Sequence, residues 1–268
     1  MRRVGLLLSV VLAAANAVAA SEQVWSGERT ISEPLEIRGC GLRLTPGARL
    51  IFKGRGKLTI LDGGLCAERA EFVGLETATN HFRIAVRNGR IDFIRCRFAG
   101  LRAMDPDPER AHYIQGFLCS QGGADARIEG CTFVDCSPVM ILNAVRLEAA
   151  RNLSIRCPNV FSFLDCCECR ISHNEFFETS SGLKISGSRL TECFRNRFTD
   201  CQTAILVSGC EDGRFVGNAI FGGQVGLRIR GKNARSVFMG NRFESVRQAF
   251  WKDKGLAESV VLRDNEVR

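Results

Sequence analysis

The segment that decides the fold lies between residues 174 and 220. Residues 174–198 read NEFFETSSGLKISGSRLTECFRNRF, and residues 196–220 read NRFTDCQTAILVSGCEDGRFVGNAI. Each stretch begins with an asparagine, carries a large apolar residue two positions later, and starts again after 22 residues. The asparagine returns every 22 to 24 residues through the C-terminal half, at Asn152, Asn174, Asn196, Asn218, Asn241 and Asn265. A fixed period in the low twenties is typical of a solenoid.

Short segments with alternating apolar residues surround each asparagine. Residues 214–216 are predicted as a strand before Asn218, and residues 226–229 as another after a short turn. No repeat contains a helical stretch of useful length, and the pattern of leucine-rich repeats does not occur. The sequence therefore predicts an all-β chain, folded as a single-stranded parallel β-helix with coils of about 22 residues that stack about 4.8 Å apart.

Two columns of this repeat are expected to build the core. The asparagines are predicted to bond between coils, because an amide side chain both donates and accepts hydrogen bonds. In earlier coils Cys96 and Cys131 stand where the asparagine is expected. Ser154 interrupts the apolar column two residues further on. The other members of that column are predicted to form one buried stack: Phe133, Phe176, Phe198, Ile220 and Phe243.

The N-terminus predicts export. Residues 1–20 combine a short basic start, an almost unbroken apolar run and small residues before Ser21, which is the pattern of a signal peptide cleaved after Ala19 or Ala20. The predicted location is therefore secreted or periplasmic. No later segment is long and apolar enough to span a bilayer, so no membrane span is expected in the mature chain, residues 21–268.

The mature chain is expected to be one β-helix domain with three parts. Residues 21–80 read as irregular N-terminal coils, and residues 130–268 as regular coils with the asparagine ladder. Between them an insertion loop is expected at about 100–118, because Phe98 and Phe133 are separated by more than one coil. In solenoids such insertions form loops on one face, often a binding face.

A family resemblance supports this fold. The runs Trp25-Ser26-Gly27-Glu28 and Leu42-Arg43-Leu44-Thr45-Pro46-Gly47-Ala48-Arg49-Leu50-Ile51-Phe52 resemble the opening of bacterial right-handed parallel β-helix repeat proteins. The later Asn-x-Phe coils resemble the pectate-lyase-like superfamily. The resemblance implies the fold but not one activity, because that superfamily includes lyases, hydrolases, epimerases and adhesins.

Two outward columns bear on chemistry. The first contains no acid, which argues against a hydrolase with paired carboxylates there; it reads Met140, Ser162, Lys184, Leu206, Arg228 and Trp251. The second, two residues after the aromatic column, is the predicted ligand-binding site: Asp135, Arg156, Glu178 and Asp200. Carboxylates about 5 Å apart can recruit a cation, so Ca²⁺ is the ion this site could hold, although no cofactor is required. The alternative is that these are turn residues bonding their own backbone.

The thirteen cysteines leave their pairing open. An odd count leaves at least one thiol unpaired in a monomer, and many are expected to be small buried apolar residues. The cluster Asp165-Cys166-Cys167-Glu168-Cys169 is the best metal candidate. On a strand, however, Cys167 and Cys169 would face one side and Cys166 the other, so the three thiolates could not surround one Zn²⁺.

These observations favour a binding protein over an enzyme. The chain has a net charge of +8, which suits an acidic polysaccharide. The prediction is a non-catalytic binding or surface-associated scaffold for such a polymer, and the alternative is a lyase or epimerase acting on uronic-acid polymers. No nucleic-acid partner is expected, because the basic residues 228–235 lack interleaved aromatics. The sequence leaves the oligomeric state open.

Overall fold

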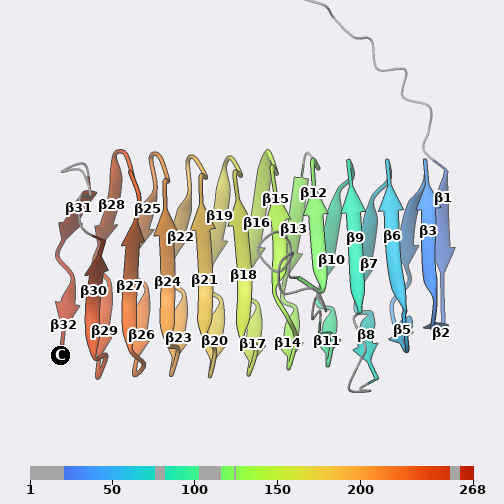
Figure 1. Cartoon of the computed structure of the whole chain (residues 1–268), viewed down its shortest axis with the longest axis horizontal. Helices are drawn as coiled ribbons and strands as arrows, with labels where there is room; N and C mark the ends of the chain where they lie inside the picture. Colours follow the sequence, from blue (N-terminus) through green and yellow to red (C-terminus); the bar gives the residue numbers. More distant parts are fainter. Residues whose placement is uncertain (1–20, 76–81, 103–115, 124, 254–259) are drawn as a thin grey trace, which may run out of the picture.

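The computed structural model describes residues 21–75, 82–102, 116–123, 125–253 and 260–268. In this part of the chain every regular element is a strand, and successive strands wind into stacked coils that form three long parallel sheets (Figure 1). The molecule is a parallel β-helix, as the period predicts, and it is right-handed, as the family resemblance implies. The predicted signal peptide and most of the predicted insertion, residues 103–115, lie outside the described residues.

Each coil contributes one strand to each sheet, and we name the sheets A, B and C. Sheet A consists of β1 (Glu22–Trp25), β4 (Gly41–Leu44), β7 (Leu65–Glu68), β10 (Ile91–Ile94), β13 (Asp125–Glu129), β16 (Arg146–Ala150), β19 (Cys169–Ser172), β22 (Glu192–Phe194), β25 (Arg214–Val216), β28 (Ser236–Met239) and β31 (Val260–Arg263). Sheet B consists of β2 (Glu28–Ile31), β5 (Arg49–Phe52), β8 (Glu71–Gly74), β11 (Arg97–Ala99), β14 (Thr132–Val134), β17 (Leu153–Ile155), β20 (Glu175–Phe177), β23 (Arg197–Thr199), β26 (Ala219–Phe221), β29 (Arg242–Glu244) and β32 (Glu266–Val267). Sheet C consists of β3 (Pro34–Arg38), β6 (Lys57–Leu61), β9 (Arg83–Arg87), β12 (Leu118–Gln121), β15 (Val139–Leu142), β18 (Asn159–Leu164), β21 (Ser181–Ser186), β24 (Thr203–Ser208), β27 (Val225–Arg230) and β30 (Gln248–Lys252).

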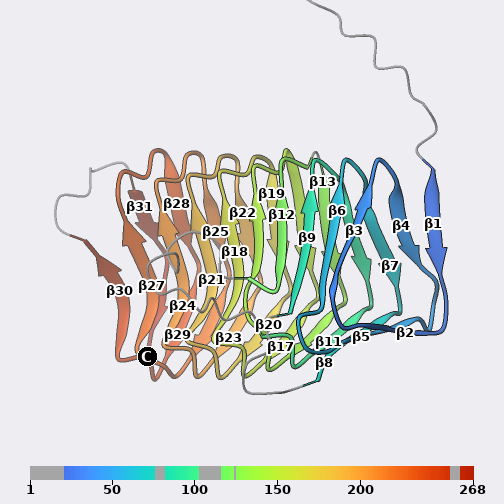
Figure 2. The same cartoon turned by 45° about the vertical axis from the view of Figure 1, so that its right-hand side comes forward.

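The N-terminal coils belong to the same three sheets as the regular ones. Strands β1 to β8 pair in parallel with the strands one coil further on, although their sequence lacks the Asn-x-Phe signal. Figure 2 shows the stack running from β1 at one end to β30 and β31 at the other. No helix among the described residues is long and apolar enough to cross a membrane.

The asparagine column forms the predicted ladder at the turn between sheets A and B. Asn196 is buried, and its Nδ2 donates to Oδ1 of Asn218 at 2.9 Å and to the carbonyl of Ile171 at 3.0 Å. Its own Oδ1 accepts from the backbone N–H of Asn174 at 3.0 Å. The same bonds link each asparagine to the next from Asn152 to Asn265. The ladder therefore satisfies polar groups that every turn would otherwise leave unpaired.

The apolar column beside the ladder is buried, as predicted. The rings of Phe176 and Phe198 stack at 4.7 Å between centroids, and Phe98 and Phe133 stack at 4.9 Å. The gap left by the small Ser154 is bridged by Phe161, whose ring packs edge-on against Phe133 at 5.6 Å and against Phe176 at 5.9 Å. Because the core columns are the same in nearly every coil, differences between the sheets are confined to their outer faces.

Candidate functional site

The outer face of sheet C carries cations and a tryptophan near the C-terminal end of the stack. Lys184, Leu206, Arg228 and Trp251 are aligned in register on β21, β24, β27 and β30. We call these four residues the basic column. Met140 and Ser162 precede them in the same register, so the acid-free column predicted from the sequence is confirmed.

The cations of the basic column are available to a ligand. The guanidinium carbon of Arg228 lies 4.9 Å from the ring centroid of Trp251, which is 41% exposed. In the part of the chain that the structure describes, neither Lys184, which is exposed, nor Arg228, which is half-buried, forms an ion pair. Nε of Arg228 is buried without a hydrogen-bond partner, so the terminal N–H groups of this guanidinium are the ones that a ligand could meet. The neighbouring Arg230 is paired with Asp253 at 3.2 Å. An aromatic ring beside free cations can bind a carboxylate and the apolar face of a sugar together.

The ligand-binding residues predicted from the sequence lie at the corner between sheets B and C. Asp135, Arg156, Glu178 and Asp200 all have left-handed backbone, with φ between 52° and 53°. This conformation is uncommon outside glycine and marks a sharp turn. Arg156 donates to both carboxylate oxygens of Asp135, at 3.1 and 2.9 Å, and thereby lowers the pKa of Asp135.

The other two acids of this corner are exposed on the next coils, and neither forms an ion pair within the described residues. The structure thus brings Asp135 to Arg156 rather than to a second carboxylate. No three His, Cys, Asp or Glu side chains of the described residues form a group that could hold a metal ion. Calcium binding at Glu178 and Asp200 stays a prediction, and calorimetric titration of Ca²⁺ into wild type and Glu178→Ala/Asp200→Ala would test it.

The outer face of sheet A carries a pattern that the sequence reasoning missed. One residue from each of six neighbouring strands forms a column in which acid and arginine alternate strictly: Asp92, Arg127, Glu148, Arg170, Glu192 and Arg214. We call this column the charge ladder. Its last four members are 22 residues apart, so the repeat period contained the signal.

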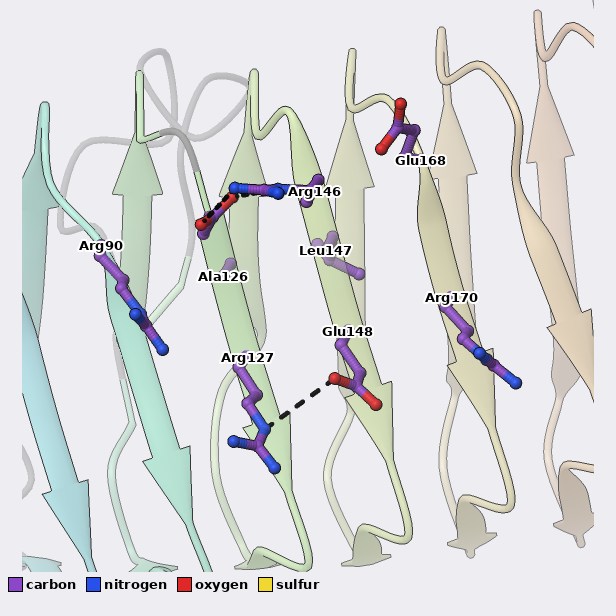
Figure 3. A pocket seen from close by; sticks show the side chains of 9 residues that line it. Arg90, Ala126, Arg127, Arg146, Leu147, Glu148, Glu168 and Arg170 are labelled. Atoms are coloured by element: carbon purple, nitrogen blue, oxygen red, sulfur yellow. Dashed lines mark hydrogen bonds and ion pairs between the residues drawn. The ribbon is translucent and has the colours of Figure 1, made fainter.

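A shallow groove of about 340 Å³ runs over the middle of this ladder (Figure 3). Beside it Arg146 holds both oxygens of Asp125, at 2.8 and 3.0 Å, and this bond lowers the pKa of Asp125. Glu129 binds Arg151 and Arg127, and the bond from Arg151 is the main reason that its pKa is lowered. The face is thus polar and dense in charge, but its charges are nearly balanced.

Comparison with known proteins agrees with this architecture. The family model described as "Periplasmic copper-binding protein (NosD)" matches residues 115–249, just over half of the chain. No curated protein sequence matches closely enough to count as a relative.

Among solved structures, the chain is similar to a double mutant of the periplasmic alginate epimerase AlgG, with 12% identity, a TM-score of 0.50 and coverage of 94% of this chain and 79% of that one. It is also similar to the Streptococcus pneumoniae surface protein and adhesin PfbA, with 8% identity, a TM-score of 0.37 and coverage of 94% and 90%. At these identities the likeness concerns the fold alone.

The described residues do not fit a copper ion. Copper prefers thiolate, thioether or imidazole ligands that converge on one point, but no three His, Cys, Asp or Glu side chains of the described residues do so. Eleven of the thirteen cysteines are buried in the coils, where they meet at most in pairs. The expected alternation of Cys166, Cys167 and Cys169 is wrong. Residues 165–168 form a turn between β18 and β19, so Cys166 and Cys169 both point inward and Cys167 is half-buried. His173, the one histidine in the described part, contacts the ring of Phe194.

Proposed function

The chain belongs to the NosD family of periplasmic β-helix proteins, and on that premise we propose that it is a non-catalytic scaffold that binds acidic polysaccharide along the basic column of sheet C. One observation carries the proposal. The basic column presents unpaired Lys184 and Arg228 and the exposed ring of Trp251 on one straight line.

The spacing of the column suits an extended polymer. Neighbouring coils are about 4.8 Å apart, so Lys184 and Arg228, two coils apart, are separated by roughly 10 Å along the axis. One coil advances by about the length of one sugar ring in an extended chain. A polyuronate lying along the solenoid axis can therefore meet both cations with carboxylates of different sugars, and Trp251 can stack under a third.

The composition of the column supports binding rather than turnover. A lyase or epimerase has to remove and deliver a proton at the uronic acid, which requires a positioned base and acid. From Met140 to Trp251 the column supplies cations, one tryptophan and neutral side chains. Lys184 is a residue type that can transfer a proton, but its neighbours in the column, Ser162 and Leu206, give it no carboxylate, histidine or tyrosine as a partner. The column can therefore neutralise and hold a carboxylate without a complete acid–base pair.

Calorimetric titration with polygalacturonate and alginate, and with dextran as the neutral control, tests the proposal. Binding of both acidic polymers but not dextran is expected. Lys184→Gln/Arg228→Gln should weaken it at least about tenfold, because two charge-assisted hydrogen bonds are lost. The matched control is Arg195→Gln/Arg197→Gln, which removes the same charge from exposed positions outside the basic column and should leave affinity unchanged.

Two results would overturn the proposal. Equal loss of affinity in both double variants would mean that net charge, rather than the basic column, attracts the polymer. New absorbance from unsaturated sugar ends, or a changed ratio of uronic acids in the recovered polymer, would replace the scaffold with the lyase or epimerase alternative.

A further inference from the structure

The charge ladder of sheet A is only partly explained by contacts within one molecule. Asp92 binds Arg90 at 2.6 Å and Arg127 binds Glu129 at 2.9 Å, but both partners lie outside the ladder. Of its five pairs of neighbours, only Arg127 and Glu148 form an ion pair in the described part of the chain, at 3.9 Å. The side chains of Glu148 and Arg170 project outward from adjacent strands without meeting (Figure 3). Arg170 instead lies over the ring of Phe194, with its guanidinium carbon 5.3 Å from the centroid.

A face of this kind is also unsuited to a polyanion. Three arginines alternate with three carboxylates, so a carboxylate would meet repulsion on every second coil. The whole chain is strongly basic, with a net charge of +8, yet this column sums to zero. A surface whose charges alternate at the coil spacing is complementary to another surface that alternates at the same spacing.

A second copy of the same face has that property. Consider two copies face to face, related by a two-fold axis that runs along the strands and passes between Glu148 and Arg170. The first ladder residue of one copy then meets the sixth of the other, the second meets the fifth, and the third meets the fourth. Because the ladder has six alternating members, every arginine faces a carboxylate: Asp92 with Arg214, Arg127 with Glu192, and Glu148 with Arg170.

The neighbouring column agrees with the same axis. At the corner just before the ladder strands, where Glu168 and Asp212 have left-handed backbone, Arg146 would lie opposite Glu168 of the second copy and Arg90 opposite Asp212. Arg146 already binds Asp125 and Arg90 already binds Asp92 within one chain, but a guanidinium has five N–H groups and can serve two carboxylates. The side chain of Leu190, 54% exposed, completes this column without adding a like charge.

We propose that this protein forms an antiparallel two-fold dimer through the outer face of sheet A, held by the self-complementary charge ladder. A two-fold interface of this kind uses the same patch on both subunits. Six strands about 4.8 Å apart give a face of several hundred Å² per partner, so the dimer belongs at the small, reversible end of specific interfaces. The basic column lies on sheet C and stays accessible in the dimer, so the two proposals are independent.

Charge reversal at the two-fold axis tests the dimer, because variants that were merely unstable would not regain affinity for each other when mixed. In Glu148→Arg an arginine faces Arg170 of the second copy, and in Arg170→Glu a glutamate faces Glu148. By sedimentation equilibrium at low salt, each variant alone should dimerise at least about tenfold more weakly than wild type, because like charges oppose each other. An equimolar mixture of the two variants should recover the affinity as a heterodimer, since every contact at the axis is then opposite in charge.

Glu175→Arg and Arg197→Glu, which are neighbours in register on sheet B, are the matched controls and should dimerise like wild type. Unchanged thermal unfolding confirms that each variant is folded. A wild type that stays monomeric across the concentration series at low salt would overturn the proposal. So would single variants that dimerise normally, or a mixture that stays as weak as its components.

Discussion

Sheets A and C are built on the same coils and the same core, yet their outer faces carry opposite kinds of charge pattern. On sheet A acid and arginine alternate from Asp92 to Arg214. On sheet C the cations Lys184 and Arg228 stand in line with Trp251 and no acid intervenes. An alternating face fits a partner that alternates, whereas an unmixed face fits a polymer of one charge sign. One scaffold can therefore present two different binding surfaces.

The outer faces of sheets A and C rest on the same core. Phe198→Ala, which opens a cavity in that core, should therefore have the largest effect on stability. Phe198 is fully buried, and a Cβ at Gly182 would come within 2.7 Å of its ring, so the site is tightly packed. The free energy of unfolding should fall by about 3–5 kcal/mol, measured by urea denaturation. Arg197→Ala, at the preceding and exposed position of β23, is the control. Similar losses in both variants would contradict the assignment of inward and outward positions.

Asn196→Ala tests the ladder that supports both faces and should have the next largest effect. The substitution removes the acceptor of the backbone N–H and of Nδ2 of Asn174, and the donor to the carbonyl of Ile171. Oδ1 of Asn218 keeps the backbone N–H of residue 196 as a partner. The expected loss is about 1–3 kcal/mol, the usual cost of a buried polar group without a hydrogen bond. Asn159→Ala removes an exposed asparagine of β18 and serves as the control. Equal melting temperatures of Asn196→Ala and wild type would show that the ladder contributes no stability.

The period of the sequence was enough to predict the core but not the faces. Asn and Phe recur because each coil has the same inward requirement, so a single alignment placed Asn196 and Phe198 correctly. The prediction for Cys166 to Cys169 failed because strand alternation stops at a turn, and left-handed backbone at Asp165 and Glu168 rotates the chain there. Such turns are set by backbone geometry that composition does not reveal.

The charge ladder shows a second reason why the sequence did not predict the outer faces. The last four members, from Glu148 to Arg214, are spaced at the repeat period, so four of the six ladder residues were readable from the sequence. Asp92 and Arg127 are 35 residues apart, and only the strand register places them in adjacent coils. Because the insertion changes the spacing, the sequence alone does not show which residues after it align with which residues before it. Sites that cross an insertion therefore need coordinates.

The charged contacts of sheet A should make a smaller, pH-dependent contribution. The carboxyl of Glu129 has a lowered pKa because Arg151 and then Arg127 bind it. A carboxyl with a lowered folded-state pKa contributes stability above its unfolded pKa, near 4.3, and loses that contribution as pH falls through the folded value. Glu129→Gln should lower stability by up to about 1 kcal/mol at pH 7, and the difference from wild type should vanish in thermal melts near pH 2. A difference that persists at low pH would mean that packing, not charge, explains it.

The smallest effect is expected for Arg228→Lys. This variant changes neither the net charge nor the core, so it tests the outer face of sheet C alone. Arg228→Lys keeps the cation of the basic column but loses the planar group over Trp251, and lysine cannot replace arginine in a stacked contact. A cation–π contact at an exposed site contributes about 0.5–1 kcal/mol, so polygalacturonate affinity should fall about two- to fivefold. Arg170→Lys is the matched control, since Arg170 also covers an aromatic ring, Phe194, but on sheet A. Calorimetry of both variants should show weaker binding for Arg228→Lys alone.

If Trp251→Leu weakens binding and Arg228→Lys weakens it no further in that background, the arginine and the ring act as one unit. Equal affinities of Arg170→Lys and Arg228→Lys would remove the stacked pair from the site and leave charge as the sole attraction of sheet C.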